Sequence, residues 1–194
     1  MRSKSEPSDG NSLHPYSSWL PFMNYIGIDN GVSGSLAILD EKGTVLQYGP
    51  TPIFKELNYT KTKAWINRID TKLLTAFLQE YSYDSCKALV ERPMVCPGRF
   101  RATVSALRAL EATQIVLEDL KIPYQWIDSR EWQKVLLPAG LEKEELKTAS
   151  TQICKRIFPS VEIKHDGDGD GLLIAEYLRR KEALGKPEVL GARA

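Results

Sequence analysis

The chain has 194 residues, of which 42% are hydrophobic, so it is long enough for one domain with a sizeable core and is not a disordered protein. Its formal net charge of +1 excludes a uniformly basic protein, so any nucleic-acid surface must come from local clustering of basic residues. The cysteines, Cys86, Cys96 and Cys154, match neither a disulfide framework nor a zinc site, and two histidines exclude a histidine-rich metal site. No apolar run approaches the ~20 residues of a membrane helix.

Residues 1–22 are rich in serine and proline and lack hydrophobic periodicity, so we predict a disordered extension. They lack the apolar core of a secretory signal, and the scattered cysteines suggest reduced thiols. We therefore expect a protein that is not secreted and that acts in a cytoplasmic or organellar compartment. A transit peptide or an artificial leader is the alternative for this segment, with Met23 as a second start. We predict a single domain over 23–182 and a flexible tail over 183–194.

The first part of the domain is predicted to be a three-stranded meander. Short apolar runs at 24–30, 35–40 and 44–48 are separated by glycine-containing turns, which is the pattern of antiparallel strands. Residues 50–69 contain prolines and scattered basic residues and are predicted to form a loop.

The second part of the domain alternates helices and strands. Strands are predicted at 87–91 and 124–127, and helices at 71–81, 102–120, just after Asp128, at 143–158 and at 170–181. A meander followed by such units predicts an α/β fold. Its mixed sheet would have five strands, the first three antiparallel, with helices on its faces.

Four carboxylates are expected to meet at one edge of this sheet. Asp29 ends the first strand, Glu91 ends the fourth, and Asp166 and Asp170 flank the start of the last helix. Unpaired acids are costly at buried strand ends, and acids four residues apart share a helix face and repel unless a cation lies between them. Hard oxygen ligands without His or Cys suit Mg²⁺ or Mn²⁺. Two such ions can activate a water and stabilise the leaving oxygen of a phosphodiester.

Each of these acids also has a purely structural interpretation. Asp29 lies in an Asp-Asn-Gly sequence typical of turns, Glu91 would form a strand-end ion pair, and residues 166–171 would be a solvated loop. Those residues also match the opening of an EF-hand calcium loop, although its twelfth position is Tyr177 instead of Glu. Asp168 is ambiguous, because it would point away from the pocket on a regular helix but would help to bind metal from a loop.

Three motifs resemble the RuvC family of Holliday-junction resolvases, which has the RNase H-like fold, and the resemblance runs from about residue 25 to 180. The motifs are IGIDNG with SGS at 26–35, LVERP at 89–93, and HDG with DGLLIA at 165–175. The last two acids are four apart, as in phage-type and plastid-type members, whereas bacterial members have them three apart. Bacterial members also have alanines at Gly169 and Gly171, and the glycines are expected to loosen the helix start by up to ~1 kcal/mol each.

The resemblance implies a crossover-junction endodeoxyribonuclease of DNA recombination and repair. Such enzymes act as homodimers on four-way DNA junctions and nick two strands symmetrically, leaving 5′-phosphate and 3′-hydroxyl ends. It implies no organic cofactor and no membrane partner. By this resemblance the residues that bind two Mg²⁺ or Mn²⁺ ions and catalyse hydrolysis are Asp29, Glu91, Asp166 and Asp170.

Basic residues close to these acids are candidate DNA contacts, because arginines beside a metal site neutralise phosphates and position the strand. Residues 92–110 contain no acid, and Phe100 lies among their arginines. We predict that Phe100 stacks on bases at the junction centre, with a core position at the helix start as the alternative. The candidate contacts are Arg92, Arg99, Arg101 and Arg108 and, from the resemblance, Lys134 and Lys147, for which ordinary exposed lysines are the alternative.

A second basic group lies in and just after the predicted loop at 50–69, where Tyr59 and Trp65 are interleaved with basic residues. A DNA-binding loop and a merely solvated loop explain this composition equally well. The basic residues are Lys55, Lys61, Lys63, Arg68 and Lys72.

Other functions use parts of the same pattern. A different RNase H-like nuclease, cutting RNA–DNA hybrids or other branched DNA, would have the same acids. An actin-like or sugar-kinase ATPase would share the turn at 29–35, but it needs two such domains to enclose ATP and the chain holds one. A DNA-binding protein without catalysis is disfavoured by the presence of all four acids.

Overall fold

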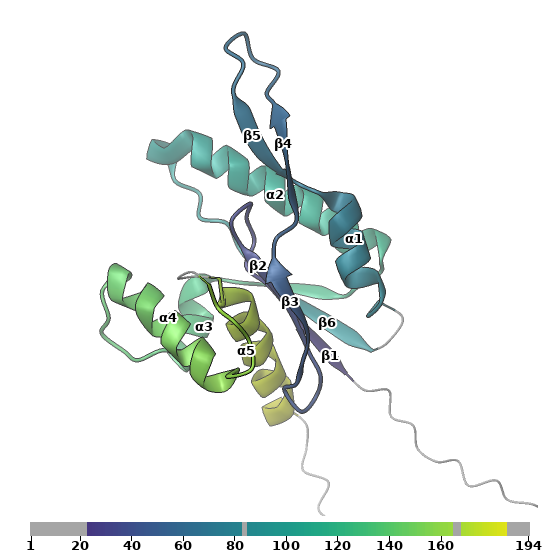
Figure 1. Ribbon diagram of the computed structural model, residues 1–194. Helices are drawn as coiled ribbons and strands as arrows, with labels where there is room; N and C mark the ends of the chain where they lie inside the picture. The colour runs from purple at the N-terminus through teal and green to yellow at the C-terminus, as the bar shows by residue number, and fades with distance from the viewer. Residues whose placement is uncertain (1–22, 83–84, 165–167, 186–194) are drawn as a thin grey trace, which may run out of the picture.

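A five-stranded sheet in the order β3-β2-β1-β6-β7 runs through the middle of the protein (Figure 1). The computed structural model describes residues 23–82, 85–164 and 168–185. The first three strands are antiparallel, as the sequence predicted, and β6 and β7 run parallel to β1, which makes the sheet mixed. The strands are β1 (Asn24–Ile28), β2 (Ser35–Leu39), β3 (Val45–Pro50), β6 (Cys86–Glu91) and β7 (Tyr124–Ile127).

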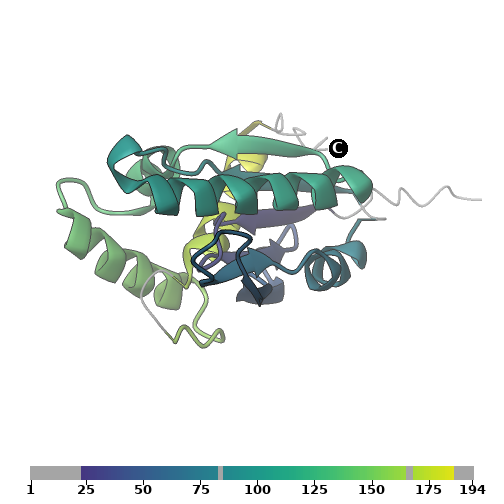
Figure 2. The same ribbon diagram turned by 90° about the horizontal axis from the view of Figure 1, so that it is seen from above.

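Helices cover both faces of the sheet, with α1 and α2 on one face and α3, α4 and α5 on the other (Figures 1 and 2). Each predicted helix is present, and α5 continues beyond its predicted end at Lys181. None of the helices in the described ranges is both long and apolar enough to span a bilayer. The helices are α1 (Thr71–Gln79), α2 (Phe100–Asp119), α3 (Ser129–Leu136), α4 (Lys143–Ile157) and α5 (Asp170–Gly185).

Strand side chains alternate between two apolar cores, and this alternation decides which way the strand-end acids point. In β1, Ile28 lies in the core under α1 and α2, whereas Tyr25 lies in the core under α5. In β6, Leu89 also lies under α5. Asp29 comes four residues after Tyr25, and Glu91 comes two residues after Leu89. Because side chains an even number of residues apart share a face of the sheet, both acids belong to the face that α5 covers.

Glycines allow α5 to lie directly on β1 and β2. A β-carbon at Gly27 would collide with the carbonyl oxygen of Gly171 and the backbone nitrogen of Ala175. A β-carbon at Gly171 would lie 2.6 Å from the carbonyl oxygen of Ser35. Gly171 is therefore required by this close approach, a role that the expectation of a loosened helix start did not include.

The segment predicted to be a loop at 50–69 instead contains a β-hairpin, so that prediction was wrong. β4 (Ile53–Leu57) pairs antiparallel with β5 (Trp65–Ile69) as a separate two-stranded sheet. The hairpin projects from the body of the protein at the top of Figure 1. Pro50 and Pro52 lie outside it, where a missing N–H removes none of its cross-strand hydrogen bonds.

Candidate active site

Asp29 and Glu91 lie at the ends of neighbouring strands. Because β1 and β6 are parallel and Ile28 lies opposite Val90, the next residue of each strand emerges at the same edge of the sheet. Burial raises the pKa of Asp29 well above its ordinary value, and the negative charges of Glu91 and Asp170 raise it further. The structure thus brings together three of the four acids that the sequence selected.

A tight turn holds Asp29 at this edge. Its backbone N–H donates to the carbonyl oxygen of Ser35 at 3.0 Å. Gly34 lies so close that a β-carbon there would collide with the carbonyl oxygen of Asp29. The Asp-Asn-Gly sequence is therefore a turn, as its structural interpretation proposed, and the turn also leaves the Asp29 carboxyl beside the other acids.

Glu91 is oriented by an indole. The Trp132 Nε1–H on α3 donates to Glu91 Oε2 at 2.9 Å, and Trp132 is fully buried. Burial raises the pKa of Glu91 to about 7, while the hydrogen bond from Trp132 favours the ionised form and opposes this rise. A buried Trp needs an acceptor for its N–H, so Trp132 and Glu91 satisfy each other.

Asp170 begins α5 and is held from α4. The Ser150 hydroxyl donates a hydrogen bond to Asp170 Oδ1, and Lys147 lies one helical turn before Ser150 on the same face of α4. Burial raises the pKa of Asp170, although the Ser150 hydrogen bond and the Lys147 charge each lower it. On the other side, the Gly171 N–H donates to Ser35 Oγ at 3.0 Å, which fixes the start of α5 on β2.

The loop before α5 is described only in part. Asp166, the fourth predicted acid, lies outside the described residues. Asp168 lies in the turn that leads into α5, and its carbonyl oxygen accepts a hydrogen bond from the Tyr48 hydroxyl at 2.9 Å. Its negative charge also contributes to the raised pKa of Asp170.

The donor set at this edge suits a hard divalent cation. The three acids are carboxylates, and none of the ion pairs found among the described residues involves Asp29, Glu91 or Asp170. Partly buried carboxylates that raise one another's pKa are stabilised by a bound cation, and oxygen ligands select Mg²⁺, Mn²⁺ or Ca²⁺. Within residues 23–82, 85–164 and 168–185, no three His, Cys, Asp or Glu side chains already stand in the geometry of a single metal site.

The EF-hand interpretation does not fit the structure. Its twelve-residue loop would run to Tyr177, but α5 is helical from Asp170 onward. Glu176, the acid nearest the last position of such a loop, is buried and paired with Arg179 at 2.7 Å and Arg180 at 2.6 Å. The carboxylate of Glu176 therefore binds arginines and is not placed to be a calcium ligand.

The arginine-rich segment after Glu91 lies on the surface. Arg92 is exposed, with its guanidinium 3.6 Å from the Asp128 carboxylate. Phe100 and Arg101 form the exposed start of α2, and Arg99, also exposed, ends the short 3-10 helix (Pro97–Arg99) just before it. Phe100 has 73% of its surface exposed, so the alternative that it is a core residue is wrong.

The predicted lysines differ in their distance from the acids. Lys147 is exposed on α4 and close enough to Asp170 to lower its pKa. Lys134 is exposed on α3, and no described contact links its side chain to the acids. The structure therefore brings Lys147, but not Lys134, to the candidate site.

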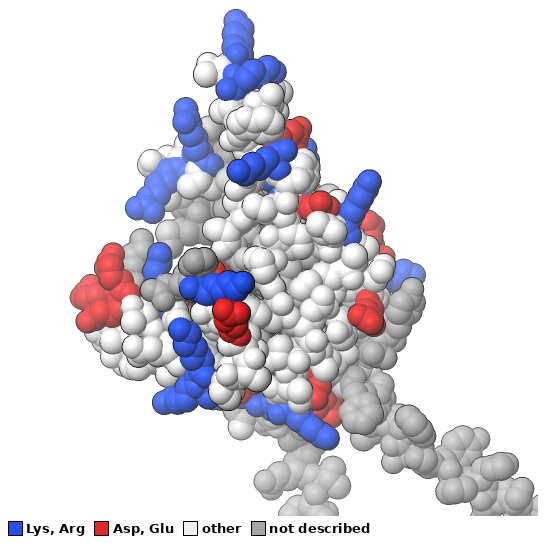
Figure 3. Space-filling model, in the orientation of Figure 1, with Lys and Arg blue, Asp and Glu red and all other residues white. Residues whose placement is uncertain are grey.

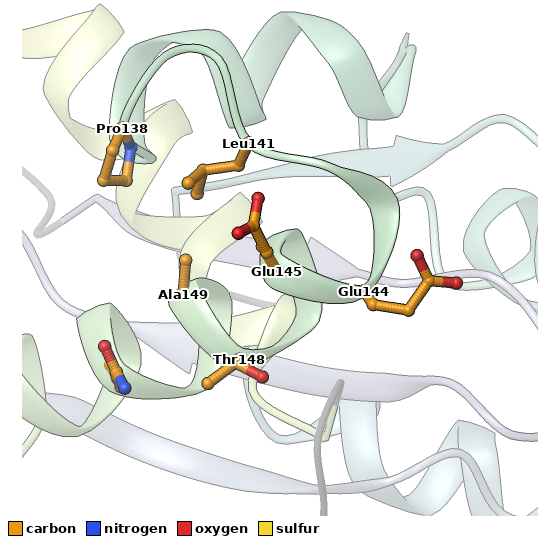
Figure 4. A pocket seen from close by; sticks show the side chains of 7 residues that line it. Pro138, Leu141, Glu144, Glu145, Thr148 and Ala149 are labelled. Atoms are coloured by element: carbon orange, nitrogen blue, oxygen red, sulfur yellow. The ribbon is translucent and has the colours of Figure 1, made fainter.

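A shallow pocket of about 460 Å³ lies away from these acids, between the loop after α3 and the outer side of α4 (Figure 4). Its lining includes Glu145 and Gln152. With about 100° between successive helical residues, these two lie on the opposite side of α4 from Lys147 and Ser150. The pocket is therefore separate from the candidate active site.

Sequence reasoning missed the residues that hold the acids. Trp132, Ser150 and Ser35 contact Glu91, Asp170 and the start of α5, respectively, and none was selected as a site residue. The one local signal that could have found any of them concerns Ser150. It lies three residues after Lys147, a selected residue, and so shares its face of the helix.

No protein-family model matches the chain, and no curated protein matches it in sequence. Among solved structures it is similar to Thermus thermophilus RuvC in complex with a Holliday junction substrate. The TM-score is 0.55 at 13% sequence identity, and the match covers 84% of this chain and 96% of that chain. A second Thermus thermophilus RuvC structure covers the same share of this chain and 97% of its own, with 14% identity and a TM-score of 0.47. The first similarity establishes the fold, which is the RuvC-like form of the RNase H-like fold.

Proposed function

We propose that the protein is a metal-dependent endonuclease that resolves four-way DNA junctions. The observation that carries the proposal is the convergence of Asp29, Glu91 and Asp170, three partly buried carboxylates with raised pKa values, at one edge of a RuvC-like sheet. The similar Thermus thermophilus protein was solved with a Holliday junction substrate, which supports branched DNA as the substrate class.

The proposed cofactor is Mg²⁺ or Mn²⁺, with two ions per site. Asp29, Glu91 and Asp170 would hold the ions together with Asp166. When bound, such ions activate a water and stabilise the leaving oxygen of a phosphodiester, which would give 5′-phosphate and 3′-hydroxyl ends. The spacing of Asp166 and Asp170 leads us to propose further that the protein is nearest to phage-type and plastid-type resolvases, in a cytoplasmic or organellar setting.

The chain's own residues would orient the acids and the DNA. Trp132 and Ser150 keep the Glu91 and Asp170 carboxylates in place through hydrogen bonds. Lys147 would offer its charge to a phosphate next to Asp170. On the surface, basic side chains gather beside α2 and over the projecting hairpin (Figure 3). We propose that Arg99 and Arg101 bind phosphates there.

We also propose that the protein acts as a homodimer through α2. Phe100, Val104, Leu107 and Ile115 are exposed apolar residues that share one side of this helix. Two copies of such a face can pack against each other around a twofold axis, and a twofold dimer suits paired nicks in a four-way junction. Leu107→Glu should convert the dimer to a monomer in analytical ultracentrifugation without unfolding it.

Cleavage of labelled synthetic DNA tests the proposed activity. Four-way junctions, linear duplex and RNA–DNA hybrid would each be incubated with Mg²⁺ or Mn²⁺, and with EDTA as control. We expect paired symmetric nicks in the junction alone, lost with EDTA. If the hybrid or the linear duplex is cut instead, the protein is a different RNase H-like nuclease with the same acids.

A further inference from the structure

We propose that the β4–β5 hairpin is a second DNA-binding element, which grips a duplex arm of the branched substrate outside the catalytic edge. The inference rests on the proposed function, because it takes DNA as the ligand. It adds a contact surface on a part of the chain that lies apart from the acids and from the start of α2.

The hairpin leaves the sheet at the same edge as the candidate active site. Pro50 at the end of β3 pairs with Ser35, and the Ser35 carbonyl accepts the backbone N–H of Asp29. The base of the hairpin is closed by a hydrogen bond from the Asp70 N–H to the carbonyl of Pro52 at 2.9 Å. Figure 1 shows the hairpin extending outward from the end of β3. DNA lying at Asp29 would therefore pass close to it.

The hairpin is long enough to reach beyond the reacting phosphate. Strands of five residues at ~3.3 Å per residue extend about 17 Å, and the tip at 58–64 adds to this. That length is about half of one helical turn of DNA, roughly 34 Å. A two-stranded ribbon also fits the major groove, which is about 12 Å wide.

The charge of the chain is concentrated on the hairpin. Residues 53–69 carry four basic side chains and one acidic side chain, a net charge of +3, whereas the whole chain has a net charge of +1. The single acid, Glu56, is paired with Arg68 at 2.6 Å. Lys55, Lys61 and Lys63 are exposed, and they supply the excess positive charge that a phosphate backbone attracts.

The exposed aromatic residues point to the same partner. Tyr59 at the tip has 91% of its surface exposed and Trp65 has 68%. Large apolar side chains that stand in solvent beside lysines are typical of surfaces that stack on bases. Trp65 also lies opposite Leu57 and stabilises the hairpin through this cross-strand pair, so its loss would not test DNA binding cleanly.

The tip is built chiefly on Asn58, and the side chains of Tyr59 and Lys61 take no part in the hydrogen bonds found there. Asn58 receives hydrogen bonds on its side-chain oxygen from the Thr60 hydroxyl at 2.8 Å and the Ala64 N–H at 3.3 Å. Its own N–H donates to the Ala64 carbonyl at 2.9 Å. Replacing Tyr59 or Lys61 therefore leaves these bonds in place, and replacing Lys63 removes in addition only the long bond of 3.4 Å from its Nζ to the Asn58 carbonyl.

The test is the affinity for a four-way junction in EDTA, measured by fluorescence anisotropy over a range of salt concentrations. Each phosphate contact contributes about 0.9 to the slope of log K against log salt. We expect the double variant Lys61→Gln/Lys63→Gln to reduce the slope by about 1.8, and Tyr59→Ala to weaken binding roughly five-fold or more with little change in slope. The matched control is Lys42→Gln/Lys181→Gln, whose exposed lysines lie at the far end of the sheet, and it should bind like the wild type.

A slope that is the same for the hairpin double variant and for its control would overturn the inference. A second overturning result is that Tyr59→Ala is a monomer in ultracentrifugation while the wild type is a dimer, which would make the hairpin an interface between copies. If the wild type binds the junction without cutting it, and the lysine double variant reduces the slope of log K against log salt, only the proposed nuclease function fails. If the wild type binds no DNA, both proposals fail.

Discussion

The indole of Trp132 and the carboxylate of Glu91 form a hydrogen bond of 2.9 Å between residues 41 positions apart in the chain. This bond favours the ionised form of an acid that burial drives toward protonation. Trp132→Phe removes the donor, so the pKa of Glu91 should rise further and the acid limb of the cleavage rate against pH should move to higher pH. The control is Trp126→Phe, which alters a partly buried tryptophan packed in the other core. A profile that keeps its position in both variants would show that Trp132 does not act through Glu91.

Stability without metal should fall as the pH rises. The pKa of Glu91 is raised from 4.5 to about 7, so between these values the folded protein holds a proton that the unfolded chain has released. The free energy of unfolding therefore decreases with pH across this window, by at most roughly 3 kcal/mol for this group. The raised pKa values of Asp29 and Asp170 act in the same direction.

Urea unfolding in EDTA at pH 5 and pH 8 measures this effect. Glu91→Gln should gain stability relative to the wild type as the pH rises, whereas Glu111→Gln, which changes an exposed acid on α2, should not. Mg²⁺ should stabilise the wild type more at pH 8 than at pH 5, because it competes with protons for the carboxylates. Parallel pH curves for the wild type and Glu91→Gln would contradict the assigned environment of Glu91.

Gly27→Ala should destabilise the protein strongly. The new methyl group would collide with backbone atoms of Gly171 and Ala175, which can move only if α5 shifts away from β1. Overpacking of this kind costs about 1–3 kcal/mol or more, and the shift would also displace Asp170. Gly98→Ala is the control, because no atom lies within 4 Å of its added β-carbon. Equal urea midpoints for the two variants would disprove the close packing of α5.

Phe100→Ala should slow junction cleavage with little effect on folding. Its side chain is exposed, so the change in the free energy of unfolding should stay within about 0.5 kcal/mol, whereas a lost base stack lowers activity roughly five-fold or more. Leu184→Ala, which alters an exposed leucine near the end of α5, is the control. Ultracentrifugation of both variants separates this effect from a loss of dimer. Cleavage at the wild-type rate would remove Phe100 from the DNA contacts.

Much of the fold followed from local patterns. Apolar runs and turn glycines located the strands of the main sheet, because helices cover both of its faces and nearly every side chain of β1, β2 and β6 is buried. The convergence of Asp29 and Glu91 followed from strand order, since parallel neighbours end at the same edge. The start of α2 was placed two residues late, because Arg99 makes no capping bond that would mark it.

Other features depend on contacts that no local pattern contains. The hairpin was missed because both of its faces are exposed, so neither face needs a row of apolar side chains. Phe54 and Leu57, for example, lie on opposite faces of β4, and the strand lacks the alternation of apolar and polar residues that would have marked it. The role of Trp132 depends on a contact between α3 and the end of β6, and its position in sequence gives no sign of it.

The most direct test of the proposed site is Asp29→Asn, assayed on a labelled four-way junction with Mg²⁺ for cleavage and with EDTA for binding. Asparagine keeps the size of the side chain but removes the charge that would hold a cation beside Glu91 and Asp170. The account predicts that paired nicks disappear while junction affinity stays close to that of the wild type and the unfolding midpoint does not fall. Cleavage at the wild-type rate would contradict it, because the carboxylate at the centre of the site would then have no part in the reaction.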